Sequence, residues 1–124
     1  MPLHSTSVGK ALAAYLPVKD AAALFQTTGL PRFTARTITS LARLKQELRR
    51  IRESGVAIDN EENTPGVRCV AAPIFGKDGS VLAALSLTGP VQQLTEEQMG
   101  RIVEKVRGAA RELSHTLGGH PLTG

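Results

Sequence analysis

The chain has 124 residues, 41% of them hydrophobic, and 15 Lys and Arg against 11 Asp and Glu give a net charge of +4. This length fits one domain, because two domains would each be too small to bury a stable core, and the hydrophobic share excludes a wholly disordered chain. The basic residues form no run of five and are interleaved with Glu, which argues against direct contact with DNA.

The compartment is predicted from cysteine usage and from the lack of long apolar segments. Cys69 is the only cysteine, so no internal disulfide can form. The sequence shows no signal peptide, and the longest apolar stretch near its start, residues 11–16, is far shorter than the about 20 residues of a membrane span. We therefore expect a cytoplasmic protein that does not contact a membrane.

Three helices are expected in the first 55 residues. A Ser/Thr cluster at residues 5–7 precedes an apolar periodic run over 8–16, the pattern of an N-cap and a short helix. Pro17 ends that helix and can begin a second one over 18–27, which Gly29 stops. A third helix begins after Ser40, repeats Leu at helical spacing, carries charges on its solvated faces, and ends at Gly55.

Three strands and a last helix are expected after Gly55. Residues 56–60, 67–75 and 80–88 are short, rich in Val, Ile and Leu, and separated by turn signals, the second of which predicts an antiparallel hairpin. Thr95 and Gln98 have the spacing of a capping box. They predict a long helix with an apolar face that runs from Met99 through residues 102, 103, 106, 110 and 113 to Leu117.

This order of elements predicts an α+β domain over residues 1–118, with an antiparallel sheet flanked by helices, and a frayed tail over 119–124. Three strands make a small sheet for four helices, so we expect one edge of the sheet to lack a partner. Such an edge invites pairing with another chain, and we predict a homo-oligomer, a dimer or a tetramer.

The start of the first helix is a candidate binding site. Its free N–H groups and positive dipole end attract anions, and Gly9 would let a ligand approach the backbone closely. A nucleotide phosphate loop is excluded, because His4 and Ala11 stand where that motif needs Gly and Ser or Thr. Two interpretations remain: a site for a small carboxylate, or a capped helix that binds nothing.

A second candidate site follows from alternation along the strands. If the three faces coincide, they gather Asp59, Cys69, Ser86 and Thr88 among apolar neighbours such as Val67. A few convergent polar groups on an apolar wall are typical of a pocket for a small ligand. In the alternative, the two hydroxyls bond to each other and the cysteine is a small buried hydrophobe.

No catalytic or metal site is predicted. A cysteine nucleophile needs a base nearby, and His4, His115 and His120 are all distant from Cys69 in sequence. The paired acids at residues 61 and 62 stand in a turn-rich stretch, where we expect them to be solvated. His and Cys do not cluster at metal-ligand spacings. We therefore predict no enzyme, no cofactor and no metal.

Several blocks of the sequence resemble the ligand-binding domain of the IclR-type (isocitrate lyase regulator) transcription factors. Residues 2–12 look like the family's opening block "PLHxTxxGKALLA". The segments 37–55, 59–75 and 78–89 are similar to the blocks that follow, in the family's order. The second of these segments holds Asp59, Glu62 and Cys69, and the resemblance extends from Pro2 to about Leu117.

The resemblance implies a GAF-like, profilin-like sensor fold for a small organic acid or an aromatic carboxylate. In the family the carboxylate of the ligand meets the backbone of the helix start, at positions matched here by Ser7 and Val8, beside Gly9. Positions matching Asp59, Cys69, Ser86 and Thr88 line the pocket, with Val67 as an apolar contact; Thr88 is commonly Ser in relatives.

The family also carries a winged helix-turn-helix and several strands before the block with which this chain opens. The resemblance therefore implies an N-terminally truncated fold and assigns DNA binding to the missing domain. The main interpretation is an effector-sensing and oligomerisation domain of a transcriptional regulator, and the alternative is an oligomerisation fragment with a vestigial pocket.

Overall fold

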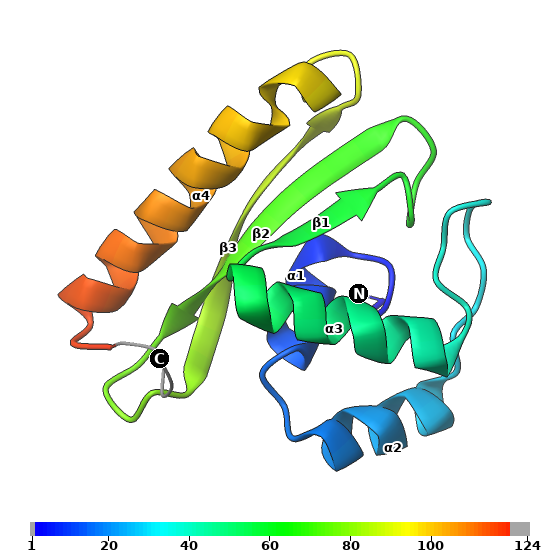
Figure 1. Ribbon diagram of the computed structural model, residues 1–124, viewed down its shortest axis with the longest axis horizontal. Helices are drawn as coiled ribbons and strands as arrows, with labels where there is room; N and C mark the ends of the chain where they lie inside the picture. Colours follow the sequence, from blue (N-terminus) through cyan, green and yellow to red (C-terminus); the bar gives the residue numbers. More distant parts are fainter. Residues whose placement is uncertain (1, 120–124) are drawn as a thin grey trace.

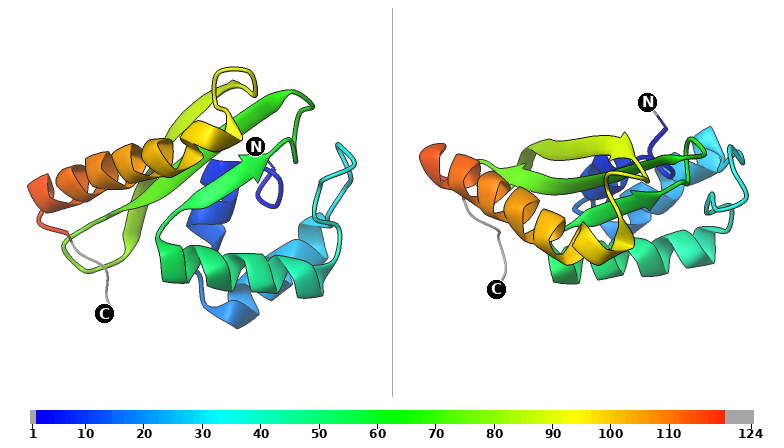
Figure 2. Two further views of the ribbon diagram at one scale, coloured as in Figure 1. Left: turned by 45° about the horizontal axis from the view of Figure 1, so that its top comes forward. Right: turned by 90° about the horizontal axis from the view of Figure 1, so that it is seen from above.

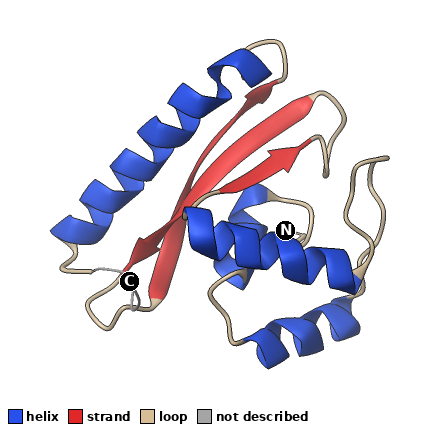
Figure 3. Ribbon diagram, in the orientation of Figure 1, coloured by secondary structure: helices blue, strands red, loops and turns tan. Residues whose placement is uncertain are grey.

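The structure is a computed structural model that describes residues 2–119. Its elements are helices α1 (Ser7–Ala13), α2 (Val18–Thr28), α3 (Leu41–Ser54) and α4 (Glu96–Thr116), and strands β1 (Ala57–Asn60), β2 (Val67–Phe75) and β3 (Val81–Pro90) (Figure 1). The predicted α+β class, with helices before and after an antiparallel sheet, is confirmed (Figure 3).

The three strands form one antiparallel sheet in the order β1-β2-β3. Helix α4 lies along one face of this sheet, where it contacts β2 and β3. Helix α1 packs on the other face against all three strands, α3 packs against α1, and α2 packs against α3 (Figure 2). We call these two surfaces of the sheet the α4 face and the α1 face.

Local signals set the ends of the first and third helices. The Thr6 hydroxyl accepts a hydrogen bond from the Gly9 N–H at 3.0 Å, and the Ser40 hydroxyl accepts one from the Arg43 N–H at 3.4 Å, so both residues act as N-caps. Gly55 ends α3 with φ of 76°, in the left-handed region that favours glycine.

The capping box predicted for the last helix is wrong in its hydrogen bonds. Thr95 occupies the N-cap position, but its side chain makes no capping bond. The Gln98 N–H instead donates to the backbone carbonyl of Thr95 at 3.1 Å. The helix still begins after Thr95, as predicted, because this backbone hydrogen bond forms its first turn.

The core is divided between the two faces of the sheet. On the α1 face, buried side chains come from α1, α2, α3 and the sheet. On the α4 face they are Val56, Val70, Ala72, Ile74, Val106 and Ala110. The apolar face predicted for α4 is wrong at its end, because Leu113 and Leu117 are exposed. Ser114 is buried instead, and its hydroxyl accepts a hydrogen bond from the Phe75 N–H at 2.9 Å.

The predicted tail lies outside the described residues apart from Gly119. The N–H of Gly119 donates to the carbonyl of Ser114 in α4 at 2.7 Å. Between residues 2 and 119, none of the helices combines the length and the apolar character that crossing a membrane would need.

Candidate functional site

The register of the sheet brings the predicted strand residues together. Asp59, Cys69 and Thr88 are partners in one row across β1, β2 and β3. The next row on the same face contains Ala57, Ala71 and Ser86. Because Ala57 and Ala71 belong to the core against α1, both rows lie on the α1 face.

Cys69 is the meeting point of the strand residues and the helix start. Burial raises the pKa of its thiol, the nearby Thr88 hydroxyl lowers it, the Asp59 carboxyl raises it, and the nearby Ser7 hydroxyl lowers it. The net direction is upward, so the thiol stays protonated at neutral pH. Three of the other predicted residues, from α1, β1 and β3, therefore surround this one sulfur atom.

Asp59 is a buried carboxyl group, with only 3% of the residue exposed. Burial and the nearby Glu62 carboxylate raise its pKa, while N–H groups of Glu62 and Asn63 and the charge of Lys10 lower it less. The Glu62 N–H donates to Asp59 Oδ1 at 2.7 Å. The site thus contains a carboxyl group that is easier to protonate than an ordinary aspartate.

The start of α1 supplies donors that are not used elsewhere in the described chain. Ser7 is buried and Val8 half-buried, and their backbone N–H groups make no hydrogen bond within residues 2–119. These are the first two amides of the helix, where the positive end of the dipole lies. They are the amides that the sequence pattern proposed for a carboxylate.

The role predicted for Gly9 is corrected by its surroundings. Its N–H is taken by the Thr6 cap. A Cβ atom on Gly9 would lie 2.6 Å from the Leu3 Cα and 2.7 Å from the Pro2 carbonyl oxygen. The bare Cα of this glycine therefore admits the chain's own preceding segment, which leaves no room there for a ligand.

The strand side of the site is open. Ser86 and Thr88 are exposed, Val67 is half-buried, and β3 pairs with β2 alone among the described strands. No hydrogen bond between Ser86 and Thr88 is found in the described chain, so the two hydroxyls do not satisfy each other. Farther along β3, Leu82 is the extra residue of a bulge, because Val81 pairs with Phe75 and Ala83 with Ile74.

A buried ionic network beside the site was missed by the sequence analysis. Lys10 is fully buried and its ammonium group pairs with Glu47 and Glu62. The expectation that Glu62 is solvated is therefore wrong; it is 8% exposed. Helical spacing could have found the lysine, because positions 7, 10, 11 and 14 form one stripe and all four are buried.

The two histidines in the described part of the chain, His4 and His115, have neighbours other than Cys69. His4 is buried, and its Nε2 lies 2.8 Å from the Pro31 carbonyl oxygen. His115 is in the last turn of α4, the helix that covers the opposite face of the sheet, and His120 lies outside the described residues. Within residues 2–119, no three His, Cys, Asp or Glu side chains are grouped to hold a metal ion.

A large groove lies elsewhere on the molecule. Its volume is about 1320 Å³, and it extends between the ends of α1 and α3, the β2–β3 hairpin and the end of α4. Its lining includes Tyr15, Arg52, Phe75 and Arg111 and none of the eight predicted ligand-binding residues. The candidate site is therefore a separate, half-open patch on the α1 face.

The sequence matches a known protein family over most of its length. A family model described as the C-terminal part of the bacterial transcriptional regulator IclR matches residues 1–115. The transcriptional repressor AllR of Salmonella typhi is 40% identical over 121 residues, which are 98% of this chain and 44% of the repressor. The chain therefore spans less than half the length of that relative.

Two solved structures have the same fold. The C-terminal domain of the Escherichia coli transcriptional regulator KdgR is 38% identical, with a TM-score of 0.86 over 94% of this chain and 71% of that domain. The inducer-binding domain of PobR from Acinetobacter, a double mutant in complex with 3-hydroxybenzoic acid, is 28% identical, with a TM-score of 0.86 over 92% of this chain and 66% of that one.

Proposed function

Because this chain belongs to the family of C-terminal domains of the bacterial IclR transcriptional regulators, we propose that it senses a small organic acid or an aromatic carboxylate. The relatives are named transcriptional regulators, which confirms the prediction that the chain is no enzyme. In this proposal it works in the cytoplasm, and contact with DNA belongs to another part of a longer regulator.

The convergence of unlike polar groups around Cys69 is the observation that supports this function. The free N–H groups of Ser7 and Val8 would bind the carboxylate of the effector, since helix-start amides favour anions. The Ser86 and Thr88 hydroxyls, on the exposed side, would bind its second polar group. Val67 supplies an apolar contact.

Asp59 fits an acidic ligand because of its burial. An ionised aspartate beside a bound carboxylate would repel it. The raised pKa of Asp59 makes the protonated form easier to reach, and that form can donate a hydrogen bond to a ligand oxygen. A ligand carboxylate would itself raise this pKa further, so binding and protonation of Asp59 would assist each other.

Calorimetric titration with three probes tests the proposal: pyruvate as a 2-oxo acid, succinate as a dicarboxylate and 3-hydroxybenzoate as an aromatic acid. We expect saturable binding of at least one, weakened about two- to tenfold by Thr88→Val, since a lost hydrogen bond to the second polar group of the ligand costs about 0.5 to 1.5 kcal/mol. Thr27→Val, on an exposed part of α2, is the matched control and should bind as wild type. Absence of binding for all three acids, or equal binding by both variants, contradicts the proposal.

The free edge of β3 favours a second function, oligomerisation. This strand of ten residues pairs only with β2 in the described chain, and Val81–Pro90 contains no charged residue. Leu82 and Leu87 are exposed. Sheet edges in monomers are usually guarded by charges or Pro, and the one proline of this strand, Pro90, is its last residue. We therefore propose that a strand from another copy pairs here and builds the dimer or tetramer.

Light scattering coupled to size-exclusion chromatography tests this second function. Leu87→Lys places a charge on the edge, and Leu113→Lys changes a leucine of the same exposure, 43%, on α4. We expect the first variant to lower the mass toward a monomer and the second to keep the wild-type mass. A monomeric wild type, or equal masses for all three proteins, contradicts it.

A further inference from the structure

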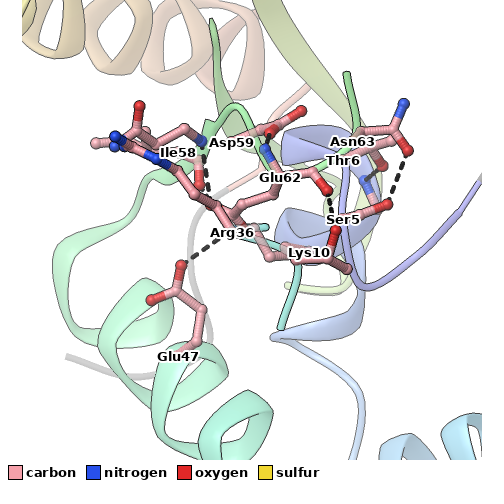
Figure 4. A network of polar contacts seen from close by, with 12 residues as sticks. Ser5, Thr6, Lys10, Arg36, Glu47, Ile58, Asp59, Glu62 and Asn63 are labelled. Atoms are coloured by element: carbon pink, nitrogen blue, oxygen red, sulfur yellow. Dashed lines mark hydrogen bonds and ion pairs between the residues drawn. The ribbon is translucent and has the colours of Figure 1, made fainter. Parts of the chain in front are cut away.

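Lys10 joins three elements through one buried ammonium group. Its Nζ donates to Glu47 Oε2 at 2.9 Å, to Glu62 Oε1 at 2.8 Å and to the Ile58 carbonyl at 2.6 Å. These partners belong to α3, to the turn after β1 and to β1 itself. Figure 4 shows Glu47 reaching from α3 toward the group around Lys10, Glu62 and Ile58. All three donors of the ammonium group are thereby used.

Residues 59–63, which are the end of β1 and the turn that follows it, include both Asp59 and Glu62. Glu62 uses one carboxylate oxygen for Lys10 and the other for the Asn60 N–H, while its own N–H holds the Asp59 carboxyl. Asn63 accepts a hydrogen bond from the Ser5 hydroxyl at 2.8 Å. A change at Asp59 therefore acts directly on the residue that Lys10 holds.

The backbone of this turn adopts a conformation that its neighbours must maintain. Glu61 has φ of 57°, the one positive value for a non-glycine residue in the described chain. Its carbonyl and that of Glu62 accept hydrogen bonds from the hydroxyls of Thr34 and Thr37, in the segment that leads into α3. The turn is thus tied to α3 twice, through Lys10 and Glu47 and through this segment.

We infer that Lys10 is a positioning residue that couples the candidate effector site at Asp59 to helix α3 through Glu62 and Glu47. Nothing in this coupling requires Lys10 to touch a ligand. A ligand that moves Asp59 changes the hydrogen bond from the Glu62 N–H to the Asp59 carboxylate. A shift of Glu62 then changes its ion pair with Lys10, and with it the strength of the Lys10–Glu47 ion pair. The response to a ligand rests on the proposed function, whereas the coupling between Asp59 and α3 exists in the chain without ligand.

Cys69 provides a ligand-free measurement of this coupling. It is the chain's only cysteine and lies beside Asp59, so its alkylation by iodoacetamide reports on the site. Glu47→Gln removes the α3 end of the network at a residue that contributes nothing to the site. At one fixed alkaline pH, we expect this variant to raise the alkylation rate of Cys69 by about threefold or more, because the turn opens more often.

Glu104→Gln is the matched control. It removes the same charge from another i,i+3 pair with arginine, on α4, and should leave the alkylation rate unchanged. The same variants are unfolded in urea, so that the rate can be compared with global stability. Three results would overturn the inference: no change with Glu47→Gln, an equal change with the control, or a rate that rises only in proportion to the global unfolding constant.

Hydrogen exchange of α3 amides completes the test in the presence of whichever of pyruvate, succinate or 3-hydroxybenzoate binds. We expect that acid to alter exchange in α3 of the wild type and to alter it less in Glu47→Gln, where only the hydrogen bonds of Thr34 and Thr37 still connect the turn to α3. Equal responses in both proteins overturn the inference. If none of the acids binds, the proposed function fails, and the alkylation rates still decide whether the coupling exists.

Discussion

The two faces of the three-stranded sheet carry different kinds of side chain. On the α4 face, Val70, Ala72 and Ile74 pack against the helix as an apolar layer. On the α1 face, the alternate positions of the same strands hold Asp59, Cys69 and Thr88. Because successive side chains of a strand point to opposite sides, the pleat of one short sheet places an apolar layer on the α4 face and the candidate site on the α1 face.

The α1 side of the sheet also buries a group of three charged side chains. Its ionic network places one ammonium and two carboxylates in a largely buried position. Desolvation makes such networks weak contributors to stability as a whole, yet breaking one partner is expensive. The comparison therefore predicts that substitutions on the two faces affect stability and binding differently.

The largest effect is expected for Lys10→Met. This change leaves the buried Glu62 carboxylate without its cation and Glu47 with Arg50 alone, which costs about 3 to 5 kcal/mol of unfolding free energy. Urea unfolding at 25 °C measures it. Adding Glu47→Gln and Glu62→Gln to the same protein should recover part of the loss, and a single variant within 1 kcal/mol of wild type would contradict the importance of the network.

A core substitution on the α4 face should lower stability alone. Ile74→Ala removes a buried side chain from the layer against α4, with an expected loss of about 2 to 4 kcal/mol. Urea unfolding gives that loss, and calorimetry with the acid that binds wild type should return an unchanged affinity below the transition. A matching fall in affinity would show that the faces are not independent.

Removal of a hydroxyl group on the α1 face should lower ligand affinity and leave stability nearly unchanged. Ser86→Ala removes an exposed hydroxyl, so stability should stay within about 0.5 kcal/mol of wild type. Affinity for the acid should fall about two- to tenfold, in line with a lost hydrogen bond to the second polar group of the ligand. Calorimetry and urea unfolding of the same sample check both numbers; an unchanged affinity would remove Ser86 from the site.

The smallest expected effect is the contribution of Glu47 to the pH dependence of the free energy of unfolding. Burial alone would raise its pKa, but hydrogen bonds and charges from Arg50 and Lys10 prevail and lower it. The unfolded chain therefore binds more protons than the folded one near the ordinary glutamate pKa, and this stabilisation is lost as pH falls through and below that range.

Urea unfolding over a series of acidic pH values, with wild type compared to Glu47→Gln, isolates this contribution. The difference in stability should shrink by about 1 kcal/mol or less as the solution becomes acidic. Subtracting the variant also removes the opposite slope of Asp59, whose raised pKa makes stability fall as pH rises. Parallel curves would show that Glu47 is not held as described.

Most of the local structure could be predicted from the sequence. Turn residues and Val-rich runs predicted β2 over 67–75, as observed, and the first and last strands within two residues of their observed ends. The bulge near Phe75 could not be predicted, since one extra residue in β3 leaves no local signal in the sequence. The end of α4 was mispredicted because an apolar residue is buried only where a surface faces it.

What the sequence by itself determined is that Asp59, Cys69 and Thr88 share a face, because strand periodicity and hairpin connections are local rules. What only the tertiary structure decided is the burial of Lys10 between Glu47 and Glu62, which stand 37 and 52 residues away in the chain. Spacing along a sequence reveals which way a side chain points. It does not reveal which distant charge will meet it, because that depends on how α1, α3 and the β1 turn pack together.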